Sequence, residues 1–430
     1  MIQINLFITI IYILTCWYLF IKDSKRAPFW IYVCIMQAWS LVSCFYNDIG
    51  IYNPELFRFT HESYATTWLA LLYIAFNFGY WVNFGCKKQL KVVNYSNFFT
   101  QQIFIRKSAK LFFLILTFYV FAMLMKYGIP VLEGLDRIEI QKNKNQFELI
   151  IENYFLVFIF LLGMLRDKLK KFTWNDILFI TYLFYFISSG HKFSGLLDVS
   201  LNYFVAIWIR WFSKSDLNKI DPIKILFWLF IFLSLFAVIV YMHYLNITGS
   251  ASGAIEELFS RLLALQGHVW WSVQNDIDLY GLYDNLHWQS ELFSVLYPDQ
   301  LNPDSFGMRY LMLNMLGDEV ASKIFERGYL YTMAYPAILV ATFPYVVVFV
   351  TQVIVGYFFS AILNYLTFCV ENNLVYRSII IWGVIIPFVN TLGSGVLNVI
   401  MTFGVLIKLV VLYLMDSNFI AKAYRHEKIF

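Results

Sequence analysis

The stretch YLFYFISSGHKFSGLLDVSLNYFVAIWIR, residues 182–210, decides the fold class of this chain. It holds two continuously apolar runs, separated only by a corner at Gly190, His191 and Lys192. A helix needs about 20 apolar residues to cross a bilayer. The two runs lack the alternation of polar and apolar residues that marks the strands of a transmembrane barrel. The stretch therefore predicts two transmembrane helices joined by a tight, basic corner.

The whole chain has the composition of a membrane protein. Of 430 residues, 60% are hydrophobic and 14% are charged, and the mean hydropathy is +0.63. Soluble domains carry about 25% charged residues, so this chain is expected to be an all-α integral membrane protein with about 11 transmembrane helices. The expected spans are residues 4–21, 28–46, 64–84, 109–126, 147–165, 174–190, 194–212, 224–244, 337–363, 376–392 and 396–415.

The basic residues orient these spans. With eleven spans, the five clusters of Lys and Arg all fall on one side, which the positive-inside rule makes cytoplasmic. The N-terminus is then outside and the C-terminus inside. The opposite side carries residues 245–336, with eleven Asp and Glu against four Lys and Arg. We expect three segments: eight spans with short loops in 1–244, a large outer segment with amphipathic helices in 245–336, and three spans with a cytoplasmic C-terminus in 337–430.

The start of the outer segment has helical periodicity. Residues 254–275, AIEELFSRLLALQGHVWWSVQN, place their leucines and valines on one side and polar residues on another, which predicts a single amphipathic helix. Arg261 and His268 would stand about 10 Å apart along one face of that helix. The alternative is an ordinary surface helix in which Glu257 and Arg261 form an ion pair.

The rest of the outer segment is rich in aromatic, amide and acidic residues. Aromatic rings beside Asp, Asn and Gln favour sugar binding, because a pyranose offers a C–H face and a rim of hydroxyls. Trp270 and Trp271 are the candidates for sugar stacking, although Trp and Tyr also gather at membrane interfaces. Asp276 and Asp278 form a D-x-D triplet, which some metal-dependent transferases use. A lone triplet occurs often by chance, so we expect no metal.

Several cationic groups come from separate parts of the expected outer face. Each has an ordinary explanation: Arg137 could pair with acidic neighbours in its own loop, and Lys192 could extend to lipid headgroups. Together they could form a pocket for a phosphate or pyrophosphate. The candidates are Arg137, His191, Lys192, Arg261 and Arg309.

The order of these features resembles the Wzy-type polymerases of bacterial surface polysaccharides, such as O-antigen polymerases. The resemblance rests on many spans, the short outer loop with GLDRIEIQ, the corner SSGHKFSG and the long outer segment that opens with RLLALQGHVWW. It covers most of the chain through order and topology. At the corner, many family members have Gly-Thr-Arg or Gly-Ser-Arg, where this chain has Gly190-His191-Lys192.

The resemblance implies an inverting, metal-independent glycosyltransferase of GT-C-like architecture in the bacterial inner membrane, with a periplasmic N-terminus and no cofactor. It would join undecaprenyl-pyrophosphate-linked repeat units into a surface polysaccharide at the periplasmic face. The donor and acceptor glycans, membrane lipid and a chain-length regulator protein are the implied partners. The five cationic residues would stabilise the leaving pyrophosphate. His268, Asp276 or Asp278 would orient or deprotonate the acceptor hydroxyl.

Other classes of protein remain as alternatives. A flippase for lipid-linked oligosaccharide would need two related halves and short loops, whereas the sequence shows no internal repeat and has a long outer segment. An acyltransferase would need a His at its cytoplasmic corners, which residues 22–26 and 87–110 lack. An O-antigen ligase would share the polymerase features. No nucleic-acid-binding motif is visible, and the net charge of +4 is used for topology.

Overall fold

The computed structural model describes residues 2–51, 64–85, 98–129, 143–166, 172–189, 193–214, 238, 241–242, 244–245, 248–263, 267–280, 287–297, 300–326, 330–331, 335–394 and 404–415. Helix accounts for 89% of these residues and no strand occurs among them, which confirms the all-α class. Three of the described helices are long and apolar enough to cross a membrane. A fourth is added if the bent pair Gln146–Glu152 and Tyr154–Met164 forms one span. The number of eleven spans stays a prediction.

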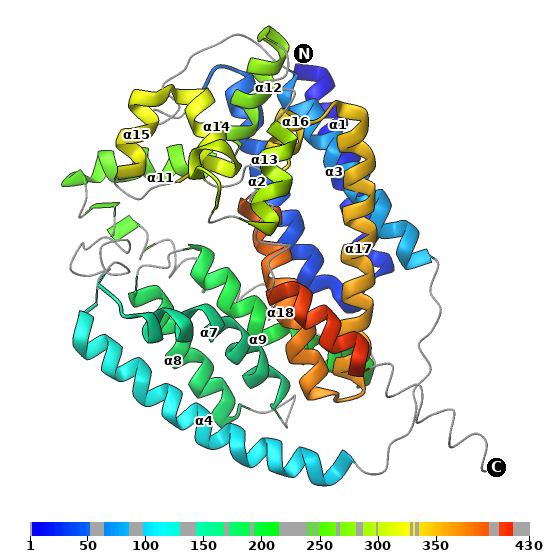
Figure 1. Ribbon diagram of the computed structural model, residues 1–430, viewed down its shortest axis with the longest axis vertical. Coiled ribbons are helices and arrows are strands. Elements are labelled where there is room, and N and C mark those ends of the chain that lie inside the picture. The colour runs from blue at the N-terminus through cyan, green and yellow to red at the C-terminus, as the bar shows by residue number, and fades with distance from the viewer. Residues whose placement is uncertain are drawn as a thin grey trace. The chain divides into compact units, whose positions relative to one another are not determined.

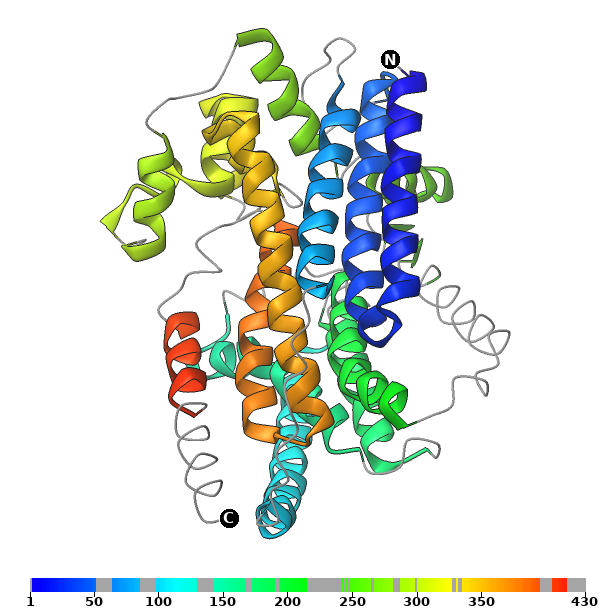
Figure 2. The ribbon, with the colours of Figure 1, turned by 90° about the vertical axis from the view of Figure 1, so that its right-hand side faces the viewer.

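Three N-terminal helices lie side by side, as the blue ribbons of Figure 2 show: α1 (Ile2–Lys22), α2 (Ala27–Asp48) and α3 (Ala65–Gly85). Their bounds agree with the expected spans to within two residues, because each apolar run stops where the helix stops. Asp48 ties their neighbouring ends together. Its Oδ2 accepts hydrogen bonds from Asn5 Nδ2 of α1 at 2.9 Å and from Thr66 N of α3 at 3.1 Å.

A second group of helices packs around residues of α9 (Phe193–Lys214) in Figure 1: α7 (Gln146–Met164) and α8 (Trp174–Ser188) both contact it, and α4 (Phe98–Tyr127) contacts α8. α4 begins 11 residues before the expected span 109–126. Hydropathy marks the part of a helix that suits a membrane and does not mark its polar extension. The span expected at 224–244 lies almost entirely outside the described residues.

The outer segment contains α11 (Ala251–Leu263), α12 (His268–Tyr280), α13 (His287–Leu296), α14 (Gly307–Leu316) and α15 (Asp318–Glu326). The single helix expected over 254–275 is wrong, because α11 and α12 are separate helices. The chain lies closest to α2 just before α12, at Gly267. A Cβ on Gly267 would lie 2.4 Å from Ser40 O and 2.6 Å from Cys44 N, so only glycine fits there.

The last described helices are α16 (Ala337–Thr342), α17 (Tyr345–Glu371), α18 (Val375–Ser394) and Gly404–Met415. The run expected at 337–363 is broken after α16, where Phe343 is extended in front of Pro344. A residue before proline is disfavoured in the helical conformation, which accounts for the break. α18 continues through Pro387.

α3 and α17 touch through glycine. A Cβ on Gly79 would lie 2.0 Å from Val353 O, and one on Gly356 would lie 2.0 Å from Phe76 O. Small residues let the backbones of membrane helices approach this closely.

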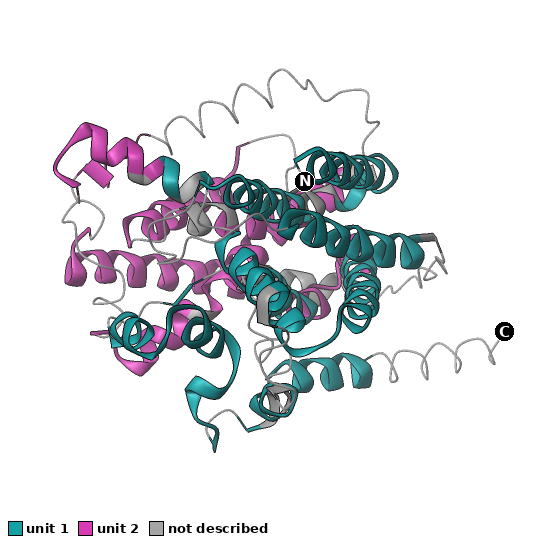
Figure 3. Ribbon diagram, turned by 90° about the horizontal axis from the view of Figure 1, so that it is seen from above, with its two compact units in different colours: residues 1–89, 259–366, 380–430 teal, residues 90–258, 367–379 magenta. Residues whose placement is uncertain are grey.

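The chain divides into two compact units, coloured separately in Figure 3. Unit 1 is Met1–Gln89, Phe259–Leu366 and Ile380–Phe430, and unit 2 is Leu90–Leu258 and Thr367–Ile379. The boundaries differ from the expected segments 1–244, 245–336 and 337–430, because most of the outer segment packs with the N-terminal helices. Each unit has its own hydrophobic core.

Candidate functional site

Helix α12 carries five of the residues that the sequence proposed for the site. Its start is held against α2, where Gly267 N donates a hydrogen bond to Ser43 Oγ at 2.7 Å. α12 also packs on α3, α14 and α16 within unit 1. Its position is therefore fixed on several sides, as a helix that presents functional side chains requires.

Trp270 and Trp271 lie in the core of unit 1. Their exposed fractions are 1% and 0%, and both belong to the hydrophobic cluster that includes Leu69 and Val273. Trp270 Nε1 donates a hydrogen bond to Ala65 O of α3 at 2.8 Å. In this arrangement the two rings hold α12 to its neighbours and offer no face on which a sugar could stack.

His268 and Asp276 are also buried, with exposed fractions of 1% and 5%. The His268 ring meets Tyr331 edge to face, with ring centroids 4.6 Å apart. Asp276 and Asp278 are two residues apart on a helix, so their side chains diverge. Asp278 is the exposed member of the pair and accepts a hydrogen bond from Gln274 Nε2 at 2.9 Å.

The surroundings of Asp278 suit its carboxylate to accept a proton. Desolvation raises the pKa of Asp278 above its usual value, and the hydrogen bond from Gln274 opposes this shift. A raised pKa brings a carboxylate closer to the range in which it can accept a proton from a hydroxyl.

The structure brings two aromatic rings to this carboxylate that the sequence did not single out. Tyr345 Oη, at the start of α17, donates a hydrogen bond to Gln274 Oε1. The Tyr345 ring stacks on Trp68 of α3, with centroids 4.5 Å apart and planes at 26°. Phe349 meets the same Trp68 ring edge to face at 6.4 Å. Trp68 and Tyr345 lie within the expected spans 64–84 and 337–363, where aromatic rings also serve as ordinary interfacial anchors, so the sequence carried no distinctive signal for them.

The group Trp68, Gln274, Asp278 and Tyr345, hereafter the α12 group, thus joins one carboxylate, one amide and two stacked rings from three helices. Trp68 and Tyr345 are half-buried and Asp278 is exposed, so part of the α12 group is accessible from outside the protein. Such a set can bind a polar ligand with an apolar face, as a sugar has.

Of the five predicted cationic residues, the structure describes the side chain of Arg309 alone. Arg309, on α14, forms an ion pair with Asp304, with Nε 2.6 Å from Oδ1, and its guanidinium lies 4.2 Å from the centroid of the Phe325 ring. Arg261 lies on α11, and its side chain is outside the description. Arg137, His191 and Lys192 are outside the described residues. Their convergence on one pocket stays a prediction.

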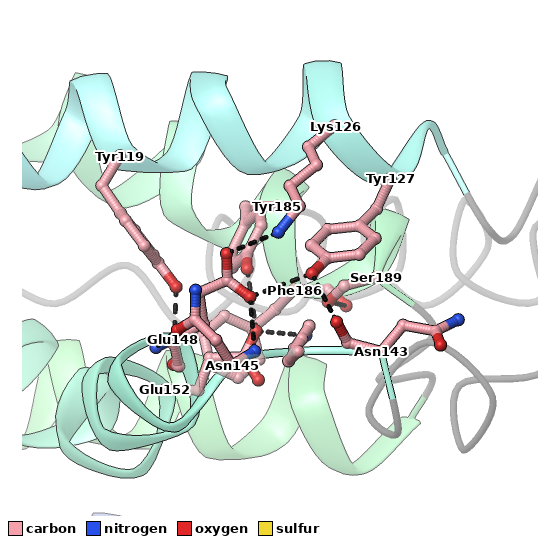
Figure 4. Close-up of polar contacts among 11 residues, drawn as sticks. Tyr119, Lys126, Tyr127, Asn143, Asn145, Glu148, Glu152, Tyr185, Phe186 and Ser189 are labelled. Atoms are coloured by element: carbon pink, nitrogen blue, oxygen red, sulfur yellow. Dashed lines mark hydrogen bonds and ion pairs between the residues drawn. The ribbon is translucent and has the colours of Figure 1, made fainter.

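Unit 2 contains a second polar cluster, drawn in Figure 4. Glu148, in the first turn of α7, receives two contacts from the end of α4: Lys126 Nζ lies 2.8 Å from Oε1, and Tyr127 Oη donates to Oε2 at 2.9 Å. Glu148 Oε2 also accepts from Asn145 N at 3.0 Å, and Asn145 Oδ1 accepts from Glu148 N at 2.9 Å. This reciprocal pair is a capping box that starts α7.

Glu152, one turn further along α7, accepts hydrogen bonds from Lys144 Nζ and, at 2.9 Å, from Tyr185 Oη of α8. The Lys144 side chain is 4% exposed, so its charge is buried with that of Glu152. We call Lys126, Tyr127, Lys144, Glu148 and Glu152 the α7 clasp. Tyr127 Oη also donates to Asn143 O at 3.2 Å, which joins the end of α4 to the residues just before α7.

The α7 clasp identifies the partner of one basic residue near Arg137 in the sequence, Lys144. The sequence offered acidic neighbours within the loop or an anionic ligand as partners for these charges. Lys144 has instead a partner in α7, one helical turn beyond the capping box. Lys126 and Tyr127 at the end of α4, and Lys144 just before α7, are therefore held by glutamates of α7.

No group of three or more His, Cys, Asp or Glu side chains suited to hold a metal ion occurs within the described ranges. The D-x-D triplet accordingly brings no third ligand of these types together within that part of the chain.

A family model described as a family of unknown function, DUF6418, matches residues 302–409. The match covers about a quarter of the chain, from α14 through α17 and α18. No curated protein and no solved structure matches the chain.

Proposed function

We propose that this protein is a membrane glycosyltransferase that joins lipid-linked oligosaccharide repeat units into a surface polysaccharide. The observation that carries the proposal is the α12 group, in which Asp278 lies beside a buried amide and a stacked Tyr345–Trp68 pair. It lies on helices of a protein that has membrane-helix character. A sugar on a lipid carrier suits both features, because the sugar matches the polar and aromatic side chains and the lipid matches the membrane.

In the proposed reaction, a hydroxyl oxygen of the acceptor sugar attacks the anomeric carbon of the donor glycan. The new C–O bond forms as the bond to the undecaprenyl pyrophosphate breaks, and a single displacement inverts the anomeric centre. Asp278 accepts the hydroxyl proton, and the leaving pyrophosphate carries away the bonding electron pair. Its raised pKa suits Asp278 to this role.

The leaving pyrophosphate needs cations. Arg137, His191, Lys192 and Arg261 are the proposed ones, and Arg309 would have to exchange Asp304 for the ligand. The α7 clasp is compatible with the part proposed for Arg137, because it holds Tyr127 and Lys144, which lie on either side of this residue in the sequence. His268 and Asp276 are proposed to maintain the position of α12 from its buried side, since neither is exposed to an acceptor in this state.

The test uses a strain that lacks the gene and carries the wild-type chain or a variant. The length distribution of surface polysaccharide is read as a ladder on a gel, and an immunoblot gives protein abundance. Asp278→Asn keeps the acceptor for Gln274 and removes the base, which should slow transfer by about 100-fold or more and reduce the ladder to short products. Glu319→Gln is the control, because Glu319 lies on α15 in an exposed pair with Lys323.

Two results separate the claims. A full deletion with an unchanged ladder would show that the protein is not the polymerase. A normal ladder with Asp278→Asn at normal abundance would instead remove Asp278 from the mechanism. Arg137→Ala and Arg261→Ala test the cations in the same assay, and long chains with both variants would exclude them.

A further inference from the structure

A groove of about 340 Å³ lies between α1 and α3 in unit 1. Its lining is mostly large and apolar, and includes Ile11, Leu14 and Tyr18 from α1 and Ile74, Phe78 and Trp81 from α3. The two helices run side by side in Figure 2, and the lining residues come from Ile11–Leu19 of α1 and Ile74–Trp81 of α3. The α12 group takes no residue from it.

We expect the groove to face hydrocarbon. α1 is one of the three helices suited to cross a membrane, and most of its residues are not buried by the rest of the protein. Leu14, Tyr18, Phe78 and Trp81 are all exposed. In a bilayer such a surface is covered either by another helix or by a lipid chain.

The size of the lining residues favours the lipid. Helices that pack together in membranes meet through small residues, and this protein does so where Gly79 of α3 meets α17. Thr15 is the one small residue in the groove lining, and its Oγ1 already accepts a hydrogen bond from Asn77 Nδ2 of α3 at 3.0 Å, whereas most of the other lining residues are large. Bulky side chains with a furrow between them fit a thin, flexible chain better than a second helix.

A cation stands at one end of the groove. Lys22 closes α1, is exposed, and holds its Nζ 5.9 Å from the centroid of the Tyr18 ring. The neighbouring carboxylate is taken elsewhere: Asp23 is paired with Arg26 at 2.6 Å and accepts a hydrogen bond from Tyr80 Oη at 2.6 Å. No carboxylate within the described part of the chain pairs with Lys22.

The length of the groove points to a lipid of one leaflet. From Ile11 to Lys22 the helix rises about 16 Å at about 1.5 Å per residue. This is about half of the roughly 30 Å hydrocarbon core. A phospholipid whose phosphate sits at Lys22 would therefore have an acyl chain of the right extent to fill the groove.

We propose that the groove between α1 and α3 binds an acyl chain of an anionic phospholipid and that Lys22 binds its phosphate. The negative headgroup complements the Lys22 ammonium, which has no carboxylate partner among the described residues, and the acyl chain covers the exposed aromatic and aliphatic side chains. The site is independent of the proposed transferase activity.

The experiment labels the purified full-length protein with phosphatidylglycerol that carries a diazirine in one acyl chain. After illumination, mass spectrometry locates the labelled peptides, and unlabelled lipids compete. Labelling should concentrate on the facing sides of α1 and α3. Phosphatidylglycerol should compete better than phosphatidylcholine and better than a polyprenyl phosphate.

Three variants sharpen the test. Lys22→Gln should reduce the preference for phosphatidylglycerol over phosphatidylcholine about fivefold, since a basic residue at a membrane surface contributes about this factor. Leu14→Trp should abolish labelling in the groove by filling it. Val346→Trp is the control, because Val346 is 75% exposed on α17 and lies outside the groove. The elution profile on size exclusion verifies that each variant is folded.

Each contrary result would overturn one part of the lipid-binding proposal. Equal labelling along all exposed helices would mean ordinary bilayer lipid and no site. An unchanged preference in Lys22→Gln would remove the headgroup contact. Stronger competition by the polyprenyl phosphate than by phosphatidylglycerol would exclude a one-leaflet phospholipid as the ligand.

Discussion

The contact between α3 and α17 makes a quantitative prediction about Gly79→Ala. The added Cβ would lie 2.0 Å from Val353 O, whereas real Cβ contacts stay beyond 3.0 Å, so the two backbones must separate by about 1 Å. Nearby contacts would loosen with them, including the hydrogen bond from Asn364 Nδ2 to Asn83 Oδ1 at 2.9 Å. Overpacking of this kind costs about 1–3 kcal/mol, and the loss of the hydrogen bond places Gly79→Ala near the upper end.

Gly383→Ala is the matched control for this change. Its Cβ would meet only the flexible Lys408 side chain, with Cε at 3.3 Å. Both substitutions gain about 1 kcal/mol from the better helix propensity of alanine, so the difference between them isolates the clash. Titration with SDS of the protein in mild detergent, followed by circular dichroism, gives the free energies of unfolding.

The double variant tests the geometry more closely. Gly79 and Gly356 face the same crossing, so a separation that accommodates the first Cβ also relieves the second. Gly79→Ala with Gly356→Ala should therefore cost clearly less than the sum of the single variants. If Gly79→Ala is as stable as Gly383→Ala, or if the two alanines are additive, the close crossing of α3 and α17 is refuted.

Three further predictions concern the described side chains. Glu152→Gln should lower the free energy of unfolding by about 3–5 kcal/mol, because it leaves the buried Lys144 ammonium without its partner. Glu148→Gln should lower it by only about 1–2 kcal/mol, because Lys126 is 52% exposed. Equal losses in the SDS titration would contradict the burial of Lys144. Cys16 of α1 and Cys34 of α2 are close neighbours, so a mild oxidant should link α1 to α2, with Cys34→Ser as the blank; the absence of a joined peptide by mass spectrometry would argue against this packing. The raised pKa of Asp278 means that its contribution to stability is fully present below the usual value of about 3.9 and is lost as pH rises through the raised value. In thermal unfolding, Asp278→Asn should therefore become more stable relative to wild type as the pH rises through this range. A stability difference that stays constant across pH would show that the pKa of Asp278 is not raised.

The helices of the bundle were predictable because their apolar runs end where the helices end. The bounds of α1, α2 and α3 agree with hydropathy to within two residues. The break at Pro344 also had a visible signal in the sequence. The break at Gly267 had no comparable signal, since its cause is the backbone of α2, which comes more than 200 residues earlier in the chain.

The candidate site was less predictable for a related reason. Trp270 and Trp271 have the residue type of sugar-binding aromatics, but α3 covers one of them through Ala65. Trp68 and Tyr345 lie in apolar runs, where an aromatic ring is usual, and only the packing of α3 with α17 places them beside Gln274. Residue type predicted the kind of chemistry, and tertiary contacts selected the residues that could perform it.

Two kinds of described charge in this apolar chain predict two kinds of phenotype. Arg26 with Asp23 and Lys144 with Glu152 are buried ion pairs, so the loss of one partner leaves a charge in a poorly solvated place and lowers stability. Lys22 is exposed and faces a groove, so its neutralisation leaves no buried charge behind. A variant at Lys22 should thus keep its stability and change its lipid preference, whereas a variant at Glu152 should lose stability whatever lipid is present. If variants at Lys22 and Glu152 instead lost stability to the same extent and changed lipid preference together, the exposed lysine would have a structural role like that of the buried pairs.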